Sequence, residues 1–543
     1  MNRRMNTKIV LLLTLTLFVY ISCKFQPPIL AIKQANPFQD IDASYAKDEI
    51  VALYNDNIMT GIKPNIFAPA QSITRAEFLA TLVRLLRLSP VQAKVPAYSD
   101  VSSSLWYYGY IQAATEIGLA TGTGPGTFSP NRPLSRQEAA AWIVRAFKQQ
   151  PDLTSTLPAY RDQSEVASWA LPYVKSVTKL QFMVGHEGFF QPKQPLSRQE
   201  AASLLYRVLH HKPWNGEFDD PIPPKIQLGW QYGQTAEQYE QSILKSNVNV
   251  MSPRWFFLEG SGRLHDYTDM TLLKWAKQHN KVVWAMLGNS FDMEATHNLL
   301  SSQTETANFT RSLITLVQRY GLQGINVDFE NIHPDDRSYF TRFIKQLSEQ
   351  MHEAGAILSV NVSPELGTDW TAAFDYEAIG QYADYVVLMG YDEHWSGSPY
   401  AGSVASLPWV RSGLDTLRQD VPNHKIILGL PFYNRDWRIK GNSTSVAAIA
   451  STDITLHEQS NLMHSFKFRP VWNDKLSQYI ATYTSSGATQ RIWLEDSRSL
   501  SLKYQMALKQ GIAGFAYWHI GGETPEIWTS LSNADRYFSY SFY

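Results

Sequence analysis

The stretch GLQGINVDFENI, residues 321–332, alternates apolar with polar side chains: Ile325, Val327 and Phe329 against Asn326, Asp328 and Glu330. Successive side chains of a β-strand point to opposite faces, so a strand here has one apolar face and one face with two acids. The carboxylates of Asp328 and Glu330 would then project into the same space from Cα atoms roughly 7 Å apart. Because a buried charge is costly unless something compensates it, this strand predicts a functional pair of acids.

Seven more apolar stretches of strand length surround this one, and most are separated by helical sequence. The eight candidate strands begin near residues 227, 248, 281, 324, 357, 385, 426 and 511. Strands alternating with helices in this number predict a (β/α)8 barrel within an α/β domain. The gap from 434 to 510 is long enough for an inserted subdomain before the last strand. In such a barrel the chemistry lies at the C-terminal ends of the strands, which is where Glu330 ends the fourth one.

The two acids of this strand have a chemistry that follows from their spacing. A negative neighbour raises the pKa of a carboxyl group, so that one acid of the pair can hold its proton near neutral pH. A protonated carboxyl at the mouth of a barrel is a general acid. We expect it to protonate the oxygen of a leaving sugar.

Four motifs then point to a family. QGINVDFE resembles the DGxDxDxE signature of glycoside hydrolase family 18, and MGYD, LGLPFYNRDW and GFAYWHIGGE follow on the sixth, seventh and eighth predicted strands. The resemblance spans residues 225–535. The stretches SPRWFFL, INVDFENI and WLEDSRS are most similar to the bacterial subgroup of wall- and spore-associated glucosaminidases.

The resemblance implies a role for each matching residue. Glu330 would be the acid/base, and Asp328 would turn the N-acetamido group of the substrate toward the anomeric carbon, so that the substrate supplies its own nucleophile. Tyr391 would bind the same carbonyl oxygen as charge develops on it. Trp518 would form the floor beneath the sugar, although a simple core ring is the alternative. Further substrate-binding positions implied are Asn326, Met389, Asp392, Tyr433 and Trp437.

Two positions depart from the longest form of the family motif. Gln323 and Asn326 stand where that motif has acids. Asn326 cannot share or relay a proton, so the way in which the pKa of Glu330 cycles between acid and base is open, and the rate is expected to be lower.

The first 212 residues contain a threefold internal repeat. ITRAEFLATLVRLL returns as LSRQEAAAWIVRAF and again as LSRQEAASLLYRVL, which makes Arg75, Arg136 and Arg198 equivalent. Each copy has an acidic opener, a helical pattern, a loop rich in glycine and proline, and a Ser/Thr-x-x-Glu spacing that starts a helix. The units predicted are 35–90, 95–150 and 157–212, with a linker rich in proline and acid at 213–224.

These units resemble S-layer homology domains, which are all-α. The resemblance implies a non-covalent anchor to secondary cell-wall polymer through Arg75, Arg136 and Arg198, because a guanidinium fork suits an anionic sugar carboxylate. The alternative is that these arginines only pair with neighbouring helices. The loop GTGPG at 122–126 lacks the Lys-Ser/Thr of a phosphate-binding loop.

The N-terminus has the pattern of an export signal, predicted at 1–22: basic residues followed by a short apolar run. The one cysteine of the chain, Cys23, follows directly, and YISC resembles a lipobox except that Tyr20 replaces the usual Leu. Lipidation of Cys23, ordinary cleaved secretion and an uncleaved anchor all remain open. We therefore expect an extracellular protein associated with the cell wall or surface layer, which touches the membrane only through a lipid on Cys23.

Composition excludes some partners. The formal net charge is -1, which provides no electrostatic attraction for nucleic acid. No His and Glu spacing matches a metal motif, and His210 and His211 lie beside the predicted linker. We expect neither a metal nor a cofactor.

Three functions fit these observations. The first is an exported glycosidase that cleaves β-1,4 bonds after N-acetylglucosamine in peptidoglycan or a chitin-like chain. The second is a wall-bound, lectin-like protein that binds glycan without turnover, against which Glu330 argues. The third is a structural surface-layer component, which the single barrel disfavours.

Overall fold

The computed structural model describes residues 36–154, 160–214, 216–260, 262–440 and 447–542. These residues form two compact units, one containing the chain up to Gln71 together with Ser197–Ser203, the other containing Ser72–Leu196 and Leu204 onward. The predicted signal segment and Cys23 lie outside the described residues. Within the described part of the chain, no helix has both the length and the apolar character needed to cross a membrane.

Each N-terminal repeat consists of a first helix, a loop and a capped second helix, as the sequence predicts. The helices are α2 (Lys47–Asn55), α3 (Arg75–Leu85), α4 (Tyr108–Glu116), α5 (Arg136–Ala146), α6 (Leu171–Lys179) and α7 (Arg198–Leu209). Thr74 and Glu77 form a reciprocal capping box at the start of α3. The same exchange of hydrogen bonds starts α5 and α7. The predicted capping residues are therefore confirmed.

The acidic residue near the start of each repeat binds the loop of the same repeat. Asp40 accepts hydrogen bonds from the backbone N–H groups of Phe67 and Ala68 at 2.9 and 2.7 Å. Asp100 and Asp162 make the equivalent pair of bonds in the second and third repeats. A carboxylate that accepts two backbone N–H groups satisfies donors that a loop cannot pair by itself, which explains why each repeat begins with an acid.

The segment predicted as a linker contains more structure than its composition suggests. It holds two short 3-10 helices, η2 (Lys212–Trp214) and η3 (Glu217–Asp219). Trp214 is buried and stacks on Phe147, with ring centroids 4.9 Å apart, and Phe218 is buried as well. Burial of these two rings is a larger effect than the weak local preferences of a stretch rich in proline and acid.

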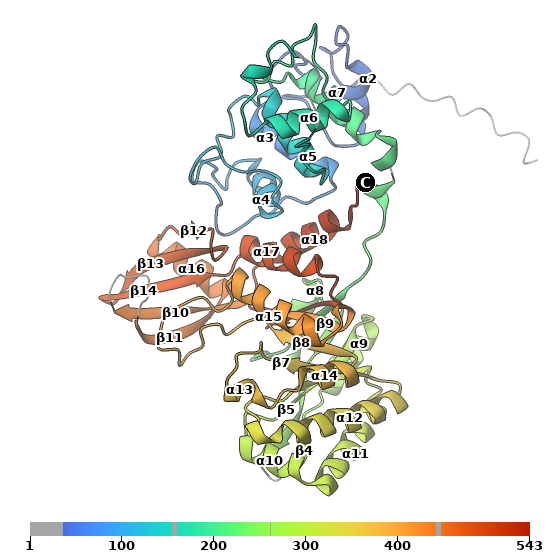
Figure 1. Cartoon of the computed structure of the whole chain (residues 1–543), viewed down its shortest axis with the longest axis vertical. Helices are drawn as coiled ribbons and strands as arrows, with labels where there is room; N and C mark the ends of the chain where they lie inside the picture. The colour runs from blue at the N-terminus through green and yellow to red at the C-terminus, as the bar shows by residue number, and fades with distance from the viewer. Residues whose placement is uncertain (1–35, 155–159, 215, 261, 441–446, 543) are drawn as a thin grey trace, which may run out of the picture. The chain divides into compact units, whose positions relative to one another are not determined.

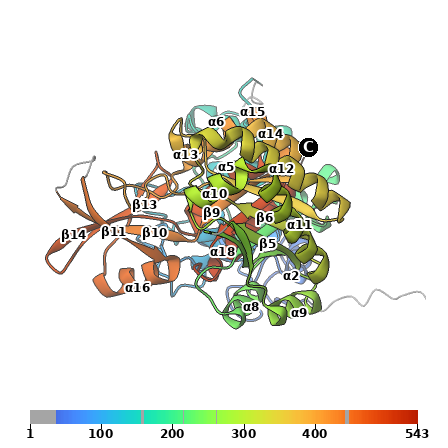
Figure 2. The same ribbon diagram turned by 90° about the horizontal axis from the view of Figure 1, so that it is seen from below.

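The C-terminal part is a closed parallel barrel, as predicted (Figures 1 and 2). Its strands are β1 (Ile226–Trp230), β2 (Val250–Ser252) continuing as β3 (Arg254–Glu259), β5 (Val282–Gly288), β6 (Gly324–Asp328), β7 (Ile357–Val362), β8 (Tyr385–Met389), β9 (Ile426–Pro431) and β15 (Gly514–Trp518). β1 pairs with both β15 and β2, and β2 pairs with β5, so the sheet has no free edge there. The eight predicted strands are all present.

Helices cover the outside of this barrel. They are α8 (Ala236–Leu244), α9 (Met270–Gln278), α10 (Met293–Ser301), α11 (Gln303–Tyr320), α12 (Arg337–Glu353), α13 (Asp369–Ala372), α14 (Tyr376–Tyr382), α15 (Leu407–Asp420), α17 (Ser497–Leu508) and α18 (Glu526–Ser539). The short strand β4 (Arg263–Asp266) pairs antiparallel with β3 at the edge. α11 ends at Tyr320 and is capped by Gly321, whose left-handed φ of 61° glycine adopts without a steric cost.

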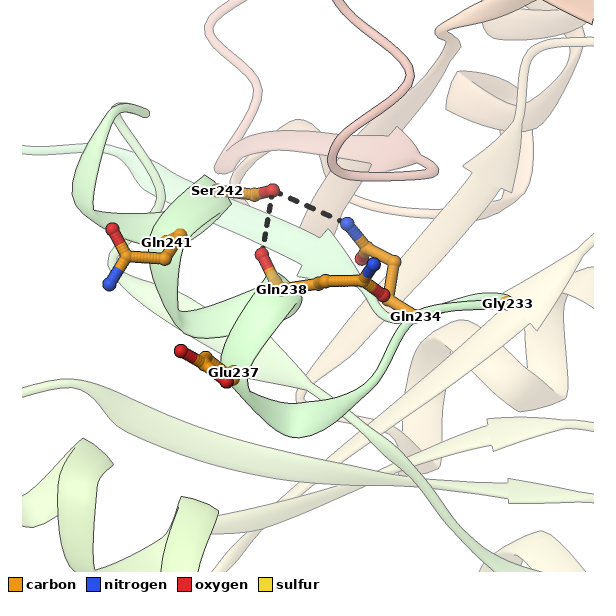
Figure 3. A pocket seen from close by; sticks show the side chains of 6 residues that line it. All are labelled: Gly233, Gln234, Glu237, Gln238, Gln241 and Ser242. Atoms are coloured by element: carbon orange, nitrogen blue, oxygen red, sulfur yellow. Dashed lines mark hydrogen bonds between the residues drawn. The ribbon is translucent and has the colours of Figure 1, made fainter.

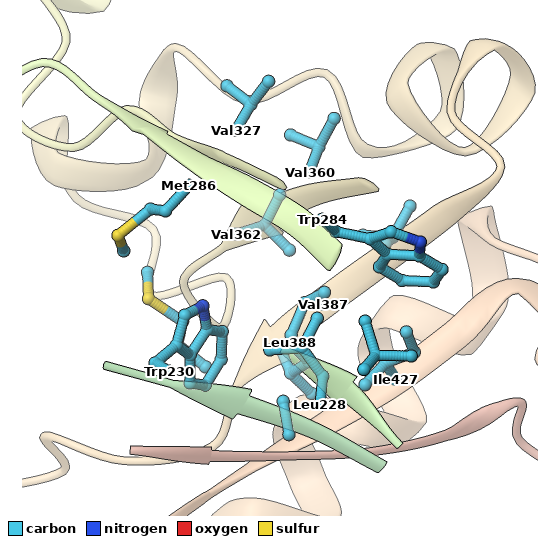
Figure 4. Close-up of a cluster of buried hydrophobic side chains, with 14 of the residues drawn as sticks. Leu228, Trp230, Trp284, Met286, Val327, Val360, Val362, Val387, Leu388 and Ile427 are labelled. Carbon is cyan, nitrogen blue, oxygen red and sulfur yellow. The ribbon is translucent and has the colours of Figure 1, made fainter. Parts of the chain in front are cut away.

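β6 and the two residues after it have the predicted two faces. Phe329 points outward and stacks on Phe343 of α12, with ring centroids 5.6 Å apart. Asn326 points inward, where it accepts a hydrogen bond from the indole of Trp230 on β1 at 2.8 Å. Figure 4 shows the apolar side chains that β1, β5, β6, β7, β8 and β9 contribute to the buried core. The barrel is thus filled, and its polar inner residues lie among large apolar ones.

An insertion lies between β9 and β15, where the sequence predicts one. It is a five-stranded antiparallel sheet in the order β11, β10, β14, β13, β12. Its elements are β10 (Tyr433–Lys440), β11 (Ala447–Thr455), α16 (Leu456–Phe466), β12 (Val471–Asn473), β13 (Gln478–Ser485) and β14 (Ala488–Leu494). β10 starts two residues after β9 ends, so its first side chains belong to the barrel mouth. A fully buried ion pair of Glu495 with Lys503, at 2.8 Å, joins the end of the insertion to α17.

Candidate active site

Asp328 is the last residue of β6, and Glu330 follows in the loop at the barrel mouth. The backbone of Glu330 is held on both sides by Asn289, which follows β5. Asn289 accepts from the Glu330 N–H at 3.0 Å and donates to its carbonyl oxygen at 2.7 Å. Asn289 is buried, and nothing in its sequence context distinguishes it from other polar residues after strands. The predicted acid is therefore positioned by a residue that the sequence analysis missed.

A line of neutral hydrogen bonds leads to Asp328. The Asn361 side chain on β7 donates to Asp328 Oδ1 at 2.8 Å and accepts from Asn326 Nδ2 at 2.7 Å. Asn326 Nδ2 also lies 2.9 Å from the hydroxyl of Ser359. Parallel pairing of β6 with β7 places Asn326 beside Ser359, which lies two residues before Asn361 on β7 and on the same face of the strand. The orientation of Asp328 is therefore set by amides and a hydroxyl group.

The electrostatics of the two acids differ. Burial raises the pKa of Glu330 well above its usual value, and the negative charges of Asp328 and Asp392 raise it further, while Arg254 opposes them. Burial also raises the pKa of Asp328, but the hydrogen bond from Asn361 and the charge of Arg254 both lower it. The pKa of both acids is therefore raised, and that of Glu330 further, so Glu330 is the member of the pair that holds a proton more readily.

Tyr391 lies near both acids. It is buried after β8, and its pKa is raised well above its usual value by burial first and then by the charges of Asp328, Glu330 and Asp392. The phenol therefore keeps its proton and can act as a hydrogen-bond donor. The structure brings together all three residues predicted to be catalytic.

Asp392 is hydrogen bonded to two side chains of the insertion. It accepts hydrogen bonds from Tyr433 Oη at 2.6 Å and from Arg435 Nη2 at 2.9 Å. Arg435 also forms an ion pair with Asp453 of β11. The first side chains of the insertion therefore fasten Asp392 at the mouth, and Met389, at the end of β8, is nearly buried beside this group.

Trp518 ends the last barrel strand and is only partly buried. Its ring centroid lies 5.9 Å from that of Trp230 and 5.2 Å from that of Tyr232. A partly exposed ring in this position has a free apolar face, whereas a core ring would not.

Two predicted substrate-binding residues do not reach the surface of the site. Trp437 is 0% exposed, packs in a cluster with Ala401, Ile439 and Trp493, and donates its indole N–H to the Gly402 carbonyl oxygen at 2.9 Å. Trp437 shares a face of β10 with Tyr433 and Arg435, but neighbouring side chains and the loop at Ala401 and Gly402 cover it completely, so the prediction of a sugar contact is wrong for this residue. Asn326 is also 0% exposed and acts only through Asn361.

Exposed aromatic rings surround the mouth. Tyr232, Phe291, Trp370, Trp395 and Tyr400 all lie after the C-terminal ends of barrel strands, and their exposed fractions range from 39% to 56%. Phe291 and Trp370 flank the loop of Glu330, with ring centroids 6.4 Å apart. Rings with this much free surface on one face of the barrel are suited to stack on sugar rings.

A separate hollow lies at the start of α8. It has a volume of about 500 Å³ and is lined by Gly233, Gln234, Glu237, Gln238, Gln241 and Ser242 (Figure 3). Ser242 accepts from Gln234 and donates to the carbonyl oxygen of Gln238. None of the predicted catalytic residues lines it. Across the described ranges of the chain, no three His, Cys, Asp or Glu residues are grouped as metal ligands.

The three repeat arginines bind backbone carbonyl groups. Arg75 is 3% exposed, donates from Nε to the Phe128 carbonyl oxygen at 3.0 Å, and pairs with Glu138 at 2.7 Å. Arg136 donates in the same way to Phe190, and Arg198 to Phe67. Each arginine thus binds the loop of another repeat, and Arg75 also pairs with a neighbouring helix, α5, through Glu138. Their role as ligands of a wall polymer remains a prediction.

The model of the family described as "Glycosyl hydrolases family 18" matches residues 231–523, which include Asp328, Glu330, Tyr391, Asp392 and Trp518. The chain belongs to glycoside hydrolase family 18. The model of the S-layer homology domain matches residues 37–79, 97–140 and 159–202. The protein is therefore a glycosidase with three domains of the kind that associate with the cell surface or S-layer, and both resemblances found in the sequence are confirmed.

Relatives of this family 18 glycosidase include an uncharacterized glycosylase, YvbX, of Bacillus subtilis, 29% identical over 57% of this chain and 91% of that protein. A cortical fragment-lytic enzyme of Bacillus anthracis is 28% identical over 47% of this chain and 60% of that protein. Among solved structures, a chitinase from Chromobacterium violaceum covers 57% of this chain and 99% of that one, with a TM-score of 0.52 and 21% identity. The last likeness is one of fold.

Proposed function

We propose that this protein hydrolyses the β-1,4 bond that follows an N-acetylglucosamine, with retention of configuration and with the substrate's own acetamido group as the nucleophile. The observation that supports this most is the pair of Asp328 and Glu330 at the end of β6, in which burial and negative neighbours raise the pKa of Glu330 further than that of Asp328, while Asn361 donates a hydrogen bond to Asp328. A single acid/base beside an anion that can orient an amide is what this mechanism requires.

Glu330 protonates the leaving glycosidic oxygen and afterwards removes a proton from water. Asp328 accepts a hydrogen bond from the acetamido N–H, which turns the carbonyl oxygen toward the anomeric carbon. Tyr391 donates its hydroxyl hydrogen to that carbonyl group as charge develops on it. The proposed route needs no carboxylate nucleophile, and Tyr433 and Arg435 hold Asp392 in place through hydrogen bonds to its Oδ1.

Because Asn326 is neutral, it cannot share or relay the proton that Glu330 transfers. In this chain the residue below Asp328 carries no charge and its amide is fully hydrogen bonded. The proton therefore stays on Glu330 or leaves with the sugar, and Asp328 keeps its negative charge throughout. We expect a slower but simpler cycle, in which Asp328 is turned only by Asn361.

A wall glycan is the substrate we favour. The S-layer homology domains hold the barrel at the cell surface, and tethering raises the effective concentration of wall glycan at the site. The cortical fragment-lytic relative is consistent with this choice, whereas the chitinase leaves chitin-like chains as the alternative. The exposed rings around the mouth favour a chain of several sugars over a single one.

Comparison of the wild type with Glu330→Gln tests the proposed function. On N-acetylglucosamine oligomers and on purified sacculi, the wild type should release new reducing ends, and the variant should bind equally well but lose most of its turnover. If the wild type binds both glycans and cleaves neither, the protein is the lectin-like alternative. Mass spectrometry of the fragments identifies the sugar at the new reducing end.

We also propose that the S-layer homology domains bind secondary cell-wall polymer. Full-length protein should sediment with native walls and stay in the supernatant when the polymer has been extracted; equal sedimentation with both would refute this. If Cys23 is lipidated, Cys23→Ala should move the protein from the detergent phase to the wall or medium. If the variant stays in the same fraction as the wild type, Cys23 does not carry a lipid anchor.

A further inference from the structure

Arg254 is a cation in the active site that has no ionic partner. It is the first residue of β3 and is partly buried. Its Nε is buried without a hydrogen-bond partner, and no ion pair found among the described residues involves its guanidinium. Arg435, also at the mouth, is by contrast paired with two carboxylates. A guanidinium that lacks such partners is costly to bury.

Aromatic rings position this guanidinium beside the catalytic residues. Its Cζ lies 5.2 Å from the ring centroid of Tyr232 and 5.2 Å from that of Phe257. Tyr232 in turn is next to Trp518, with ring centroids 5.2 Å apart. The charge of Arg254 is also close enough to lower the pKa of both Asp328 and Glu330. Arg254 therefore lies one ring away from the proposed floor of the sugar site.

The neighbouring carboxyl groups do not serve as partners of Arg254. Asp328 takes its hydrogen bond from Asn361, and Glu330 must hold a proton to act as an acid. An ion pair between Arg254 and Glu330 would keep that carboxyl ionised and remove the general acid. Contact with rings leaves the N–H donors of a guanidinium available. The N–H donors of Arg254 are therefore available to an anion that the protein itself does not supply.

We propose that Arg254 binds a free carboxylate on the sugar next to the N-acetylglucosamine that rests on Trp518. The planar fork of a guanidinium matches a carboxylate, and in a wall glycan the neighbouring sugar carries an O-lactyl carboxyl group. This proposal rests on the proposed function and adds the class of substrate to it: acidic strands whose lactyl carboxyl groups are free. Since stem peptides occupy those groups through amide bonds, an amide-hydrolysing reaction must supply the substrate.

Three soluble substrates test this proposal: glycan strands freed of peptide by an amidase, the same strands with their carboxyl groups converted to neutral amides by carbodiimide-activated coupling to ammonia, and N-acetylglucosamine oligomers. The wild type should show a kcat/KM about 10- to 100-fold higher on the acidic than on the amidated strands. In Arg254→Gln this ratio should fall to about one. Arg311→Gln, on the exposed face of α11, is the matched control and should keep the wild-type ratio.

The outcomes separate the two proposals. If the wild type cleaves none of the substrates, the proposed function fails. If it cleaves them but does not distinguish acidic from amidated strands, or if Arg254→Gln lowers kcat/KM equally on both, only the assignment of Arg254 fails. Arg254→Lys keeps the charge without the fork and should retain part of the ratio. The comparison of the two strand preparations on the wild type needs no variant to fold.

Discussion

Replacing Asn361 by alanine tests the line of hydrogen bonds beneath the catalytic pair. In the structure the amide of Asn361 donates to Asp328 Oδ1 at 2.8 Å, and it is the side chain whose hydrogen bond lowers the pKa of that carboxyl. Without it, burial raises the pKa of Asp328 unopposed except by the charge of Arg254. The anion that orients the acetamido group then becomes harder to form.

The magnitude follows from the kind of bond removed. A hydrogen bond to a charged group contributes about 1.5–3 kcal/mol. If this free energy is lost from the stabilisation of the transition state, kcat decreases by about 10- to 150-fold. The second bond of Asn361 adds little, because Asn326 Nδ2 keeps its contact with Ser359. The bond favours the ionised form, so its removal raises the pKa of Asp328, and the acid limb of the activity profile moves to higher pH.

The assay is a pH profile of kcat and kcat/KM on a short N-acetylglucosamine oligomer. The expected result is a lower maximum together with an acid limb displaced upward by about one pH unit or more. Ser359→Ala is the matched control, since this residue is on the same strand and touches Asn326 but not Asp328; its limb should move far less. A uniform loss of activity in Asn361→Ala with an unmoved limb would refute the reasoning, because packing alone would then explain the loss.

Three further predictions concern stability. Burial raises the pKa of Asp496 from 3.8 to about 6, so the free energy of unfolding should decrease as pH rises from about 4 to 6. This decrease is at most about 3 kcal/mol. Asp496→Asn should abolish it, which urea unfolding at several pH values would measure. Arg75→Leu should lower the stability of the repeats by about 3 kcal/mol, because it leaves Glu138 and the Phe128 carbonyl group without this partner; an unchanged melting temperature would show that Arg75 is not structural. Trp437→Phe should lower the melting temperature through the lost bond to Gly402 yet keep kcat/KM within about twofold; a large loss of activity would restore it as a sugar contact.

Local pattern was enough to predict the barrel, the insertion and the capped helices. Alternation in residues 324–330 separates an outward Phe329 from an inward Asp328 without any knowledge of partners, because side-chain direction on a strand is a local property. Capping boxes are equally local, which is why Thr74 and Glu77 were found from spacing alone. The same reasoning misjudged Trp437, since it could assign a motif residue to a strand but could not tell that the distant loop at Ala401 and Gly402 would cover that part of the strand.

The sequence by itself predicted the candidate residues: an acid pair on one strand face, a tyrosine and a tryptophan at later strand ends, and three equivalent arginines. Only the tertiary structure decided how those residues are held. Asn289 and Arg254 come from parts of the chain far from Glu330, and Asn361 from a part far from Asp328; they meet these acids because parallel strands bring their C-terminal ends to one mouth. The burial that raises the pKa of Glu330, and the hydrogen bond that lowers that of Asp328, exist only once the barrel has closed.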